Sequence, residues 1–420
     1  MSNESYLWTL TIYFFGYVLF EVPANIVLRR VPPRIWLPTL MALWGMVGVF
    51  MGLVHNLQGL LAARFFLGLA EAGLFPGAVF YMSMWYARHE QHYRISLFFS
   101  AAALAGAFGG VLAFAIGKMN GIGGKSGWSW IFIIESMFTI VVAIFALFLI
   151  HDYPDKATCL NEEERELCIA RLKAVVMPPT TSRSPGTMCT ELFRNLPLYT
   201  LSLFLPTIIK NLGYSAANAQ LLTVPPYALA FITTVLAAHY SFVFRVRAAF
   251  IIAGCVFAGI GYIVLLSSLR HGAQYAGVMI AAGGIYPASA ITLSWPANNV
   301  SGQTKRAVAC ATQISIGIFG GAVVGSQMYR PKQIPAYKLG HGMALGFLGL
   351  TVTAAATQWA LLNRRNKAKA IARDEWQSRR TRQESDVSSP QTISENGGVE
   401  RLREEEASIG DRSIYWIYQL

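Results

Sequence analysis

Two charged side chains stand inside the apolar stretch RFFLGLAEAGLFPGAVFYMSMWY, residues 64–86. Arg64, Gly68 and Glu71 follow one another at four and then three positions, which places all three on one face of a helix. A charge at the centre of a bilayer costs about 2.5–3.5 kcal/mol on insertion scales, so two on one face indicate a polar, protein-lined environment. A carboxyl that alternates between ionised and protonated states can couple proton movement to transport.

The alternative role for Arg64 and Glu71 is a static polar contact that holds neighbouring helices together. Ionisable residues within membrane spans are functional by default, which favours the transport role. Glu21 and Glu135 are two further carboxylates inside apolar segments, and either could instead reach the interface or pair locally. Gln313 is a weaker candidate for the same substrate or proton pathway.

The elements that carry these residues are apolar helices. The chain has 420 residues, of which 54% are hydrophobic and 13% charged, whereas a soluble domain has about 25% charged residues. This composition indicates an all-α polytopic protein of the lipid bilayer. A span needs about 20 apolar residues, and we expect spans at 7–29, 36–54, 58–86, 94–117, 128–150, 216–240, 248–269, 273–299, 306–329 and 342–363.

An eleventh segment, 197–210, is apolar but short. Fourteen helical residues reach about 21 Å, against a hydrocarbon core of about 30 Å. Asn161 and Glu164 have the spacing of a capping box, which predicts a short surface helix, and residues 178–187 read as a linker. The expected organisation is therefore a helix bundle over 1–150, a central loop over 151–196, a second bundle over 197–363 and a disordered tail over 364–420.

The chain repeats itself at an offset of 211 positions. GAFGG at 106–110 recurs as GIFGG at 317–321. The same offset relates basic residues in short turns, Arg34 with Arg245 and Arg94 with Lys305. These matches indicate that the chain consists of two homologous halves, an architecture known in transporters. The small residues of these stretches predict close helix packing, with a rocking interface as the alternative.

The distribution of positive charge predicts the orientation. The net charge is +12, which could indicate nucleic acid, but the basic residues lie in short turns, the central loop and the tail. That pattern is typical of cytoplasmic membrane loops, so we expect no nucleic-acid partner and a cytoplasmic C-terminal tail. With eleven helices, the N-terminus lies outside, Glu21 near the cytoplasmic end of its span and Glu135 nearer the outer end.

Other functional classes lack their signals. The five cysteines are scattered and odd in number, without CxxC or Cys/His spacing, so no metal site or disulfide framework is expected. No cofactor motif, nucleophile–base pair or Walker-type loop occurs, which argues against an enzyme and against an ATP-driven pump.

Several long blocks resemble the major facilitator superfamily, and within it the fungal anion:cation symporters of the allantoate permease type. The opening stretch is similar to that family's fourth helix. Later blocks follow in family order: RISLFFSAAALAGAFGG, GWSWIFIIES, DYPD…LNEEER, PLYTLSLFLPTIIKNLGYS and LSWPANNVSGQTKRAV. The resemblance covers about residues 6–365, and Arg64 and Glu71 match the family's polar pair in a helix that lines the transport cavity.

The resemblance implies a two-bundle fold of twelve helices and proton-coupled uptake of a small organic anion. Nicotinate, allantoate, pantothenate or a related carboxylate are the expected substrates. We further expect the protein to be a monomer and to reside in the plasma membrane. Because the chain begins at what resembles the second helix, we expect about eleven of twelve helices, and a truncated or inactive form is one expectation.

Two other departures from the family pattern accompany the missing helix. One is that the seventh helix lacks its first half. The other concerns single residues: HYSFVFRVR, residues 239–247, has Phe242 and Val243 where the family pattern leads us to expect an acidic–basic pair. Likewise, Ile318 stands where Asn is expected. A non-transporting membrane sensor or binding protein on the same scaffold is the alternative function. Uptake without a signalling phenotype separates the two.

Overall fold

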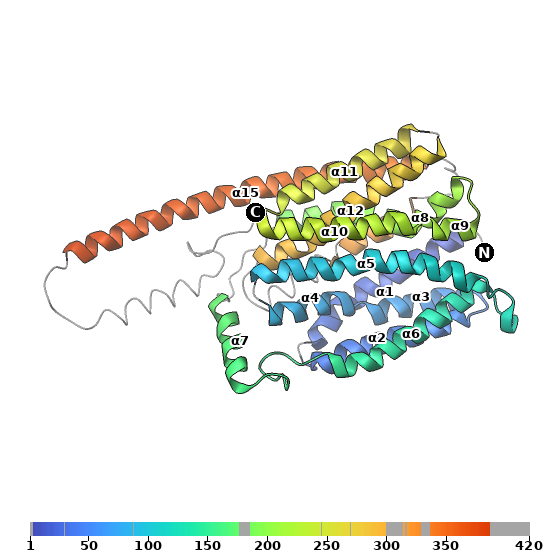
Figure 1. Ribbon diagram of the computed structural model, residues 1–420, viewed down its shortest axis with the longest axis horizontal. Coiled ribbons are helices and arrows are strands. Elements are labelled where there is room, and N and C mark those ends of the chain that lie inside the picture. The colour runs from blue at the N-terminus through green and yellow to red at the C-terminus, as the bar shows by residue number, and fades with distance from the viewer. Residues whose placement is uncertain are drawn as a thin grey trace.

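The computed structural model describes residues 3–28, 30–86, 88–175, 185–244, 246–268, 270–299, 314–315, 317–328 and 337–386. Most of the described helices lie alongside one another and form one elongated bundle (Figure 1). Within the described residues, nine helices are long and apolar enough to cross a membrane. The expectation of an all-α membrane protein is therefore confirmed.

The first half contains the helices that precede the central loop. Their bounds are α1 (Asn3–Leu28), α2 (Pro33–Gly52), α3 (Leu57–Glu71), α4 (Leu74–Trp85), α5 (Arg88–Gly117), the 3₁₀ turn η1 (Ile122–Gly124) and α6 (Gly127–Leu149). The start of α3 is fixed by Asn56, whose side chain accepts a hydrogen bond from the Gly59 amide at 2.7 Å. The expected span over 58–86 is found as the span Leu57–Trp85, with a break at residues 72–73 between α3 and α4.

The second half follows the central loop. Its described elements are α8 (Pro185–Asn211), α9 (Ala216–Leu221), α10 (Val224–Phe244), α11 (Ala248–Ser267), α12 (His271–Asn299), the π-helix η2 (Ile318–Val323), α14 (Val324–Ser326) and α15 (Lys338–Asp386). Much of the expected span over 306–329 lies outside the described residues. The η2 segment is of interest because π-helical turns are frequent at functional sites.

The helix that contains residues 197–210 is longer than expected, although it is not one of the nine described helices that are long and apolar enough to cross a membrane. The helix α8 contains 27 residues and begins at Pro185, so it reaches about 40 Å. Glu191 and Arg194 interrupt the apolar pattern before residue 197, which is why the sequence alone placed the start too late. Residues 185–187 of the linker expected over 178–187 belong to α8, and the rest of it lies outside the described residues.

The central loop and the tail both contain helix. The expected surface helix is confirmed as α7 (Glu162–Val175), and the Asn161 amide donates to the Glu164 carboxylate at 3.0 Å. Disorder from residue 364 is wrong for 364–386, because α15 continues to Asp386 and projects beyond the bundle (Figure 1). Residues 364–386 contain neither Gly nor Pro, so helix propagation meets no breaker. The projection and α7 lie at the same end of the bundle, named here the α7 end (Figure 1).

Glycines bring the helix backbones close together, as their spacing predicted. A Cβ at Gly261 of α11 would lie 2.6 Å from the Gly277 carbonyl oxygen of α12, closer than carbon and oxygen can approach. In the repeated glycine stretches, Gly110 of α5 meets the Gln220 carbonyl, and Gly321 of η2 meets the backbone at Asn195. Close packing of the small-residue faces is confirmed at these positions.

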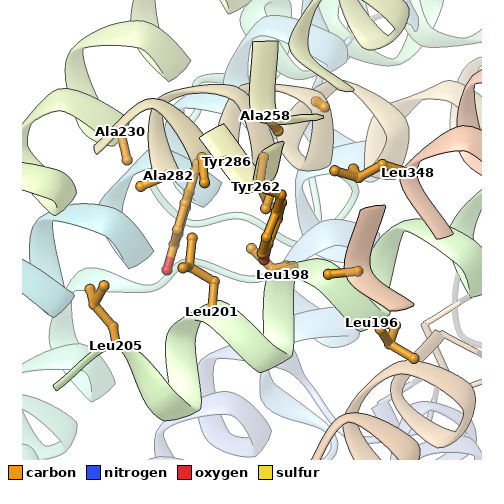
Figure 2. Close-up of a cluster of buried hydrophobic side chains, with 14 of the residues drawn as sticks. Leu196, Leu198, Leu201, Leu205, Ala230, Ala258, Tyr262, Ala282, Tyr286 and Leu348 are labelled. Carbon is orange, nitrogen blue, oxygen red and sulfur yellow. The ribbon is translucent and has the colours of Figure 1, made fainter. Parts of the chain in front are cut away.

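The largest hydrophobic core lies mainly in the second half. Figure 2 shows leucines of α8 beneath Tyr262 of α11 and Tyr286 of α12. The Tyr262 hydroxyl donates to the Pro197 carbonyl oxygen at 3.2 Å, and the Tyr286 hydroxyl lies 3.0 Å from Ser202 Oγ. Each buried ring thus has a partner for its polar tip, as buried tyrosines require.

The two halves meet through α1 and α5. The helix α5 packs on α10 and α12, while α1 packs on η2 and α14. The helices differ in how deeply they are buried. In the most apolar 18-residue stretch of each helix, 83% of α12 is buried, against 11% of α6. The helix α12 is therefore internal, and α6 lies at an outer edge of the molecule.

Candidate functional site

Glu71 lies near the middle of the span Leu57–Trp85, at the point where α3 ends. Its side chain is partly buried, and its Oε2 atom accepts a hydrogen bond of 2.7 Å from the Tyr13 hydroxyl of α1. The partner of this carboxyl group is a neutral donor and not a cation. At mid-membrane depth, such a group is stable in the protonated form as well as in the ionised form.

A close crossing of α1 and α3 places Tyr13 beside Glu71. A Cβ at Gly68 of α3 would fall on the Tyr13 carbonyl oxygen, and a Cβ at Gly16 of α1 would fall on the Phe65 carbonyl oxygen. Both positions therefore require glycine for the helices to approach this closely. The middle residue of the predicted face, Gly68, thus serves to bring Tyr13 within reach of Glu71.

Arg64 shares the face of Glu71, but the described residues contain no ion pair between them. The Arg64 Nε atom is buried without a hydrogen-bond partner, and the guanidinium carbon lies 5.5 Å from the centre of the Phe132 ring of α6. The charges of Arg64 and Glu71 still act on each other at longer range. The guanidinium is therefore available to an anion, for which its planar fork of donors is suited.

An aromatic cluster surrounds this position and joins the two halves. We define the central aromatic cluster as Tyr13, Phe14, Tyr17, Phe75, Phe99 and Tyr199. Phe14 of α1 and Tyr199 of α8 meet edge to face at 5.5 Å between ring centres. Apolar residues of α12 and η2 complete the packing. Glu71 thus borders a region built from both halves.

Glu21 bridges the halves instead of pairing locally. Its side chain is fully buried, and Ser315, 294 positions further along the chain, donates to its Oε2 atom at 2.6 Å. The Oε1 atom is buried without a partner. Because no donor or cation among the described residues reaches Oε1, a proton on that atom suits this buried position.

A second polar contact between the halves was missed in the sequence. Thr11 of α1 lies 2.8 Å from Ser326 through their hydroxyl oxygens, and the Gln327 side-chain amide donates to Thr11 at 2.7 Å. The only available signal was a pair of polar residues directly after the glycine-rich stretch ending at Gly325. Together with the bond between Glu21 and Ser315, these bonds connect α1 to residues on both sides of η2.

The structure does not bring Glu135 to this group. It lies on the outer helix α6 and is partly exposed. Thr139 bonds to its backbone carbonyl oxygen, while no hydrogen bond to its carboxylate occurs among the described residues. The remaining predicted residue, Gln313, lies outside the described residues.

The described residues contain no group of three or more His, Cys, Asp or Glu side chains that could hold a metal ion. The chemistry that remains is that of a carboxyl able to gain and lose a proton, a cation able to attract a carboxylate, and hydroxyl groups that connect the halves. These groups can bind and release a proton or an anion without forming a covalent bond.

Comparisons with known proteins give a consistent result. The model of the Major Facilitator Superfamily matches residues 1–355. The chain is 34% identical over 394 residues to the MFS-type transporter cnsO of Penicillium expansum, covering 87% of this chain and 76% of that protein. It is 29% identical over 386 residues to the high-affinity nicotinic acid transporter of Saccharomyces cerevisiae, covering 88% and 72%. Its fold is similar to the proton:xylose symporter XylE, with a TM-score of 0.66, 15% identity and 86% and 87% coverage.

Proposed function

Because the chain belongs to the Major Facilitator Superfamily and is therefore a transporter and not an enzyme, we propose that it imports a small organic anion together with a proton. The substrate class is a monocarboxylate of the nicotinate, allantoate or pantothenate kind. A relative that matches 88% of this chain is named as a high-affinity nicotinic acid transporter, which supports this class. The allantoate permease type is the proposed subfamily.

The observation that carries the proposal is the environment of Glu71. The carboxylate lies at mid-span, receives a hydrogen bond from the neutral Tyr13 and has no ion pair among the described residues. Such a group can be protonated from one side of the membrane and deprotonated to the other as the halves rearrange. Arg64, on the same helix face, supplies the positive charge that attracts the carboxylate of the substrate.

Glu21 is the proposed second proton-carrying group. Its bond to Ser315 joins α1 to the other half, so separation of the halves at that point exposes the carboxyl and changes its preference for a proton. Glu135, on the outer helix α6, is the less suitable partner for Glu71.

The proposed orientation places the α7 end in the cytoplasm. The tail helix beyond residue 363 is rich in Arg and Lys, and positive segments next to a span remain on the cytoplasmic side. We further propose that the protein acts as a monomer in the plasma membrane.

The test is uptake of a panel of radiolabelled carboxylates at an acidic and a neutral external pH. Inward proton coupling predicts faster accumulation at the acidic pH, because the proton gradient then drives the substrate inward. A protonophore should abolish the difference. Accumulation that is unchanged by pH and protonophore would exclude proton coupling, and failure of every carboxylate while a neutral solute is taken up would exclude the substrate class.

A further inference from the structure

The end of α15 that leaves the bundle carries three exposed cations, and the proposed transport pathway does not use them. Leu362 is the last buried residue of this helix, with 3% of its surface exposed, and no described side chain of α15 after it is buried. Arg364, Arg365 and Lys367 follow within two turns and are exposed. We name these three residues the basic collar, and beyond it the helix projects from the bundle (Figure 1).

The basic collar lies at the level of the lipid headgroups. Residues 339–363 contain no Asp, Glu, Lys or Arg, so the membrane-spanning part of α15 ends where the collar begins. From Lys338 to Arg364 the helix rises about 39 Å, and a bilayer with its headgroup layers is about 40–45 Å thick. Trp359, 38% exposed, lies between one and two turns before the collar, where interfacial tryptophans are enriched. The helix thus places its first three cations beside the phosphate groups of the bilayer.

The three collar side chains have no hydrogen bond or ion pair to any described residue. Arginines near the start of two other membrane helices do have partners within the protein. Arg34 of α2 donates from Nε to the Leu147 carbonyl oxygen at 3.2 Å, and the Arg94 guanidinium carbon of α5 lies 3.7 Å from the centre of the Tyr86 ring. The collar cations are therefore the ones that the described fold leaves available to an outside ligand.

The positive charge of the collar is not balanced along the helix. The first acidic residue after it is Asp374, which lies about 10 Å beyond Lys367 along the helix axis. Side-chain charges separated by about 10 Å are largely screened by physiological salt where they are exposed to water. The collar consequently presents a local excess of positive charge to whatever lies beside it.

Anionic phosphate groups suit the collar chemically. A guanidinium can bind two phosphate oxygens at once, and the lysine ammonium adds a compact positive charge. Clusters of Lys and Arg directly after a membrane helix attract anionic headgroups, and this attraction falls away within about a Debye length of the surface. A soluble acidic partner is the alternative occupant, but the depth of the collar places headgroups closer to it than any soluble molecule.

We propose that the basic collar binds the anionic headgroups of membrane lipids where the span of α15 ends. The bound headgroup fixes the depth of α15 in the bilayer and so supports its packing on α8 and α11. The inference rests on the proposed orientation only for which leaflet supplies the lipid. It does not require transport, because lipid binding can be measured in a protein that moves no substrate.

The experiment uses the full chain, purified in a mild detergent. Native mass spectrometry counts the lipids that remain bound after titration with phosphatidylserine or with phosphatidylcholine, which also contains a phosphate but has no net charge. We expect the parent to bind phosphatidylserine at least about ten-fold more tightly than phosphatidylcholine. The variant R364Q/R365Q/K367Q should lose at least about ten-fold in affinity for phosphatidylserine and keep its affinity for phosphatidylcholine.

The matched control is R379Q/R380Q/R382Q, which removes the same charge from the same helix. Its substitutions begin about 22 Å further along the axis than Arg364, beyond the reach of the headgroup charges, so it should bind both lipids as the parent does. Lys367→Gln is a smaller change in case the triple collar variant is not obtained folded, and it should weaken phosphatidylserine binding about five-fold.

Three results would overturn the proposal. Equal binding of the two lipids by the parent would leave the collar to a soluble acidic partner. Phosphatidylserine binding at the parent's affinity by both collar variants would show that these cations do not hold the lipid. A loss in R379Q/R380Q/R382Q as large as that in R364Q/R365Q/K367Q would show that total charge, and not position at the membrane surface, determines binding.

Discussion

The two halves of the molecule differ in where they keep their charges. The first half has ionisable side chains well inside its membrane helices: Glu21, Arg64, Glu71 and Glu135. The spans Ala216–Phe244, Ala248–Ser267 and His271–Trp295 of the second half contain no Asp, Glu, Lys or Arg. In the second half, glycine-to-carbonyl packing and tyrosine hydroxyls hold the helices together.

The difference assigns separate tasks to the two halves. The first half provides the groups that can hold a proton or attract an anion, and the second half provides a tightly packed partner surface. The second half contributes mainly hydroxyl and amide groups to the junction, such as Ser315 and Gln327. In the proposed function, transport depends on charge changes in one half that alter its bonds to the other.

The largest expected effect is the loss of accumulation in Glu71→Gln. Glutamine keeps the size and the hydrogen bond with Tyr13 but cannot release a proton, so substrate should equilibrate across the membrane without being concentrated. The measurement is the steady-state ratio of internal to external labelled substrate in intact cells. Glu166→Gln, on the exposed face of α7, is the matched control and should concentrate substrate as the parent does.

Arg64→Lys should reduce substrate uptake at least about ten-fold. Lysine retains the charge but not the planar fork that binds both oxygens of a carboxylate, and loss of such a bond corresponds to about 1.4 kcal/mol or more. Initial rates across a range of substrate concentrations check this effect. Uptake equal to that of the parent would show that positive charge alone is sufficient at this position.

The packing of the second half can be broken at Gly261. Leucine in its place would force α11 and α12 apart, because the Gly277 carbonyl oxygen and the Ala281 amide occupy the space of the side chain. We expect a loss of about 1–3 kcal/mol in stability, measured by thermal unfolding in detergent. Gly349→Leu is the control, since a Cβ at Gly349 meets nothing within 4 Å. Equal stability of the two variants would contradict the close packing.

Ser315→Ala should have the smallest effect and should act on coupling rather than on folding. It removes the hydrogen bond to Glu21, a bond that contributes about 0.5–1.5 kcal/mol. A shift of a few-fold in the proton concentration that gives half-maximal uptake is expected, with unchanged protein level. If Ser315→Ala and the parent have superimposable pH profiles, Glu21 takes no part in proton movement.

Sequence reasoning located most helices because a membrane span is defined by local composition. The start of α8 was missed because Glu191 and Arg194 lie in the turns that precede its apolar part, and composition has no means of extending a helix through charged residues. The continuation of α15 was missed for a similar reason, since charged and Ser-rich residues are common both to disorder and to a solvated helix.

The candidate site was predictable only in part. Helical periodicity placed Arg64, Gly68 and Glu71 on one face, but their partners depend on tertiary structure. Tyr13 and Glu71 are 58 positions apart, and Glu21 and Ser315 are 294 apart. Periodicity within one helix carries no information about which helix packs against it, so the role of Gly68 in bringing Tyr13 to Glu71 required the fold.

The central claim is that Glu71 carries the transported proton, and substrate-driven proton uptake tests it most directly. The purified chain is reconstituted into liposomes that contain a pH-sensitive dye, and a carboxylate substrate identified by the uptake panel is added outside. The account predicts that the interior of liposomes with the parent protein acidifies on addition of substrate, and that Glu71→Gln admits substrate without acidification. Acidification by Glu71→Gln at the rate of the parent would contradict the account.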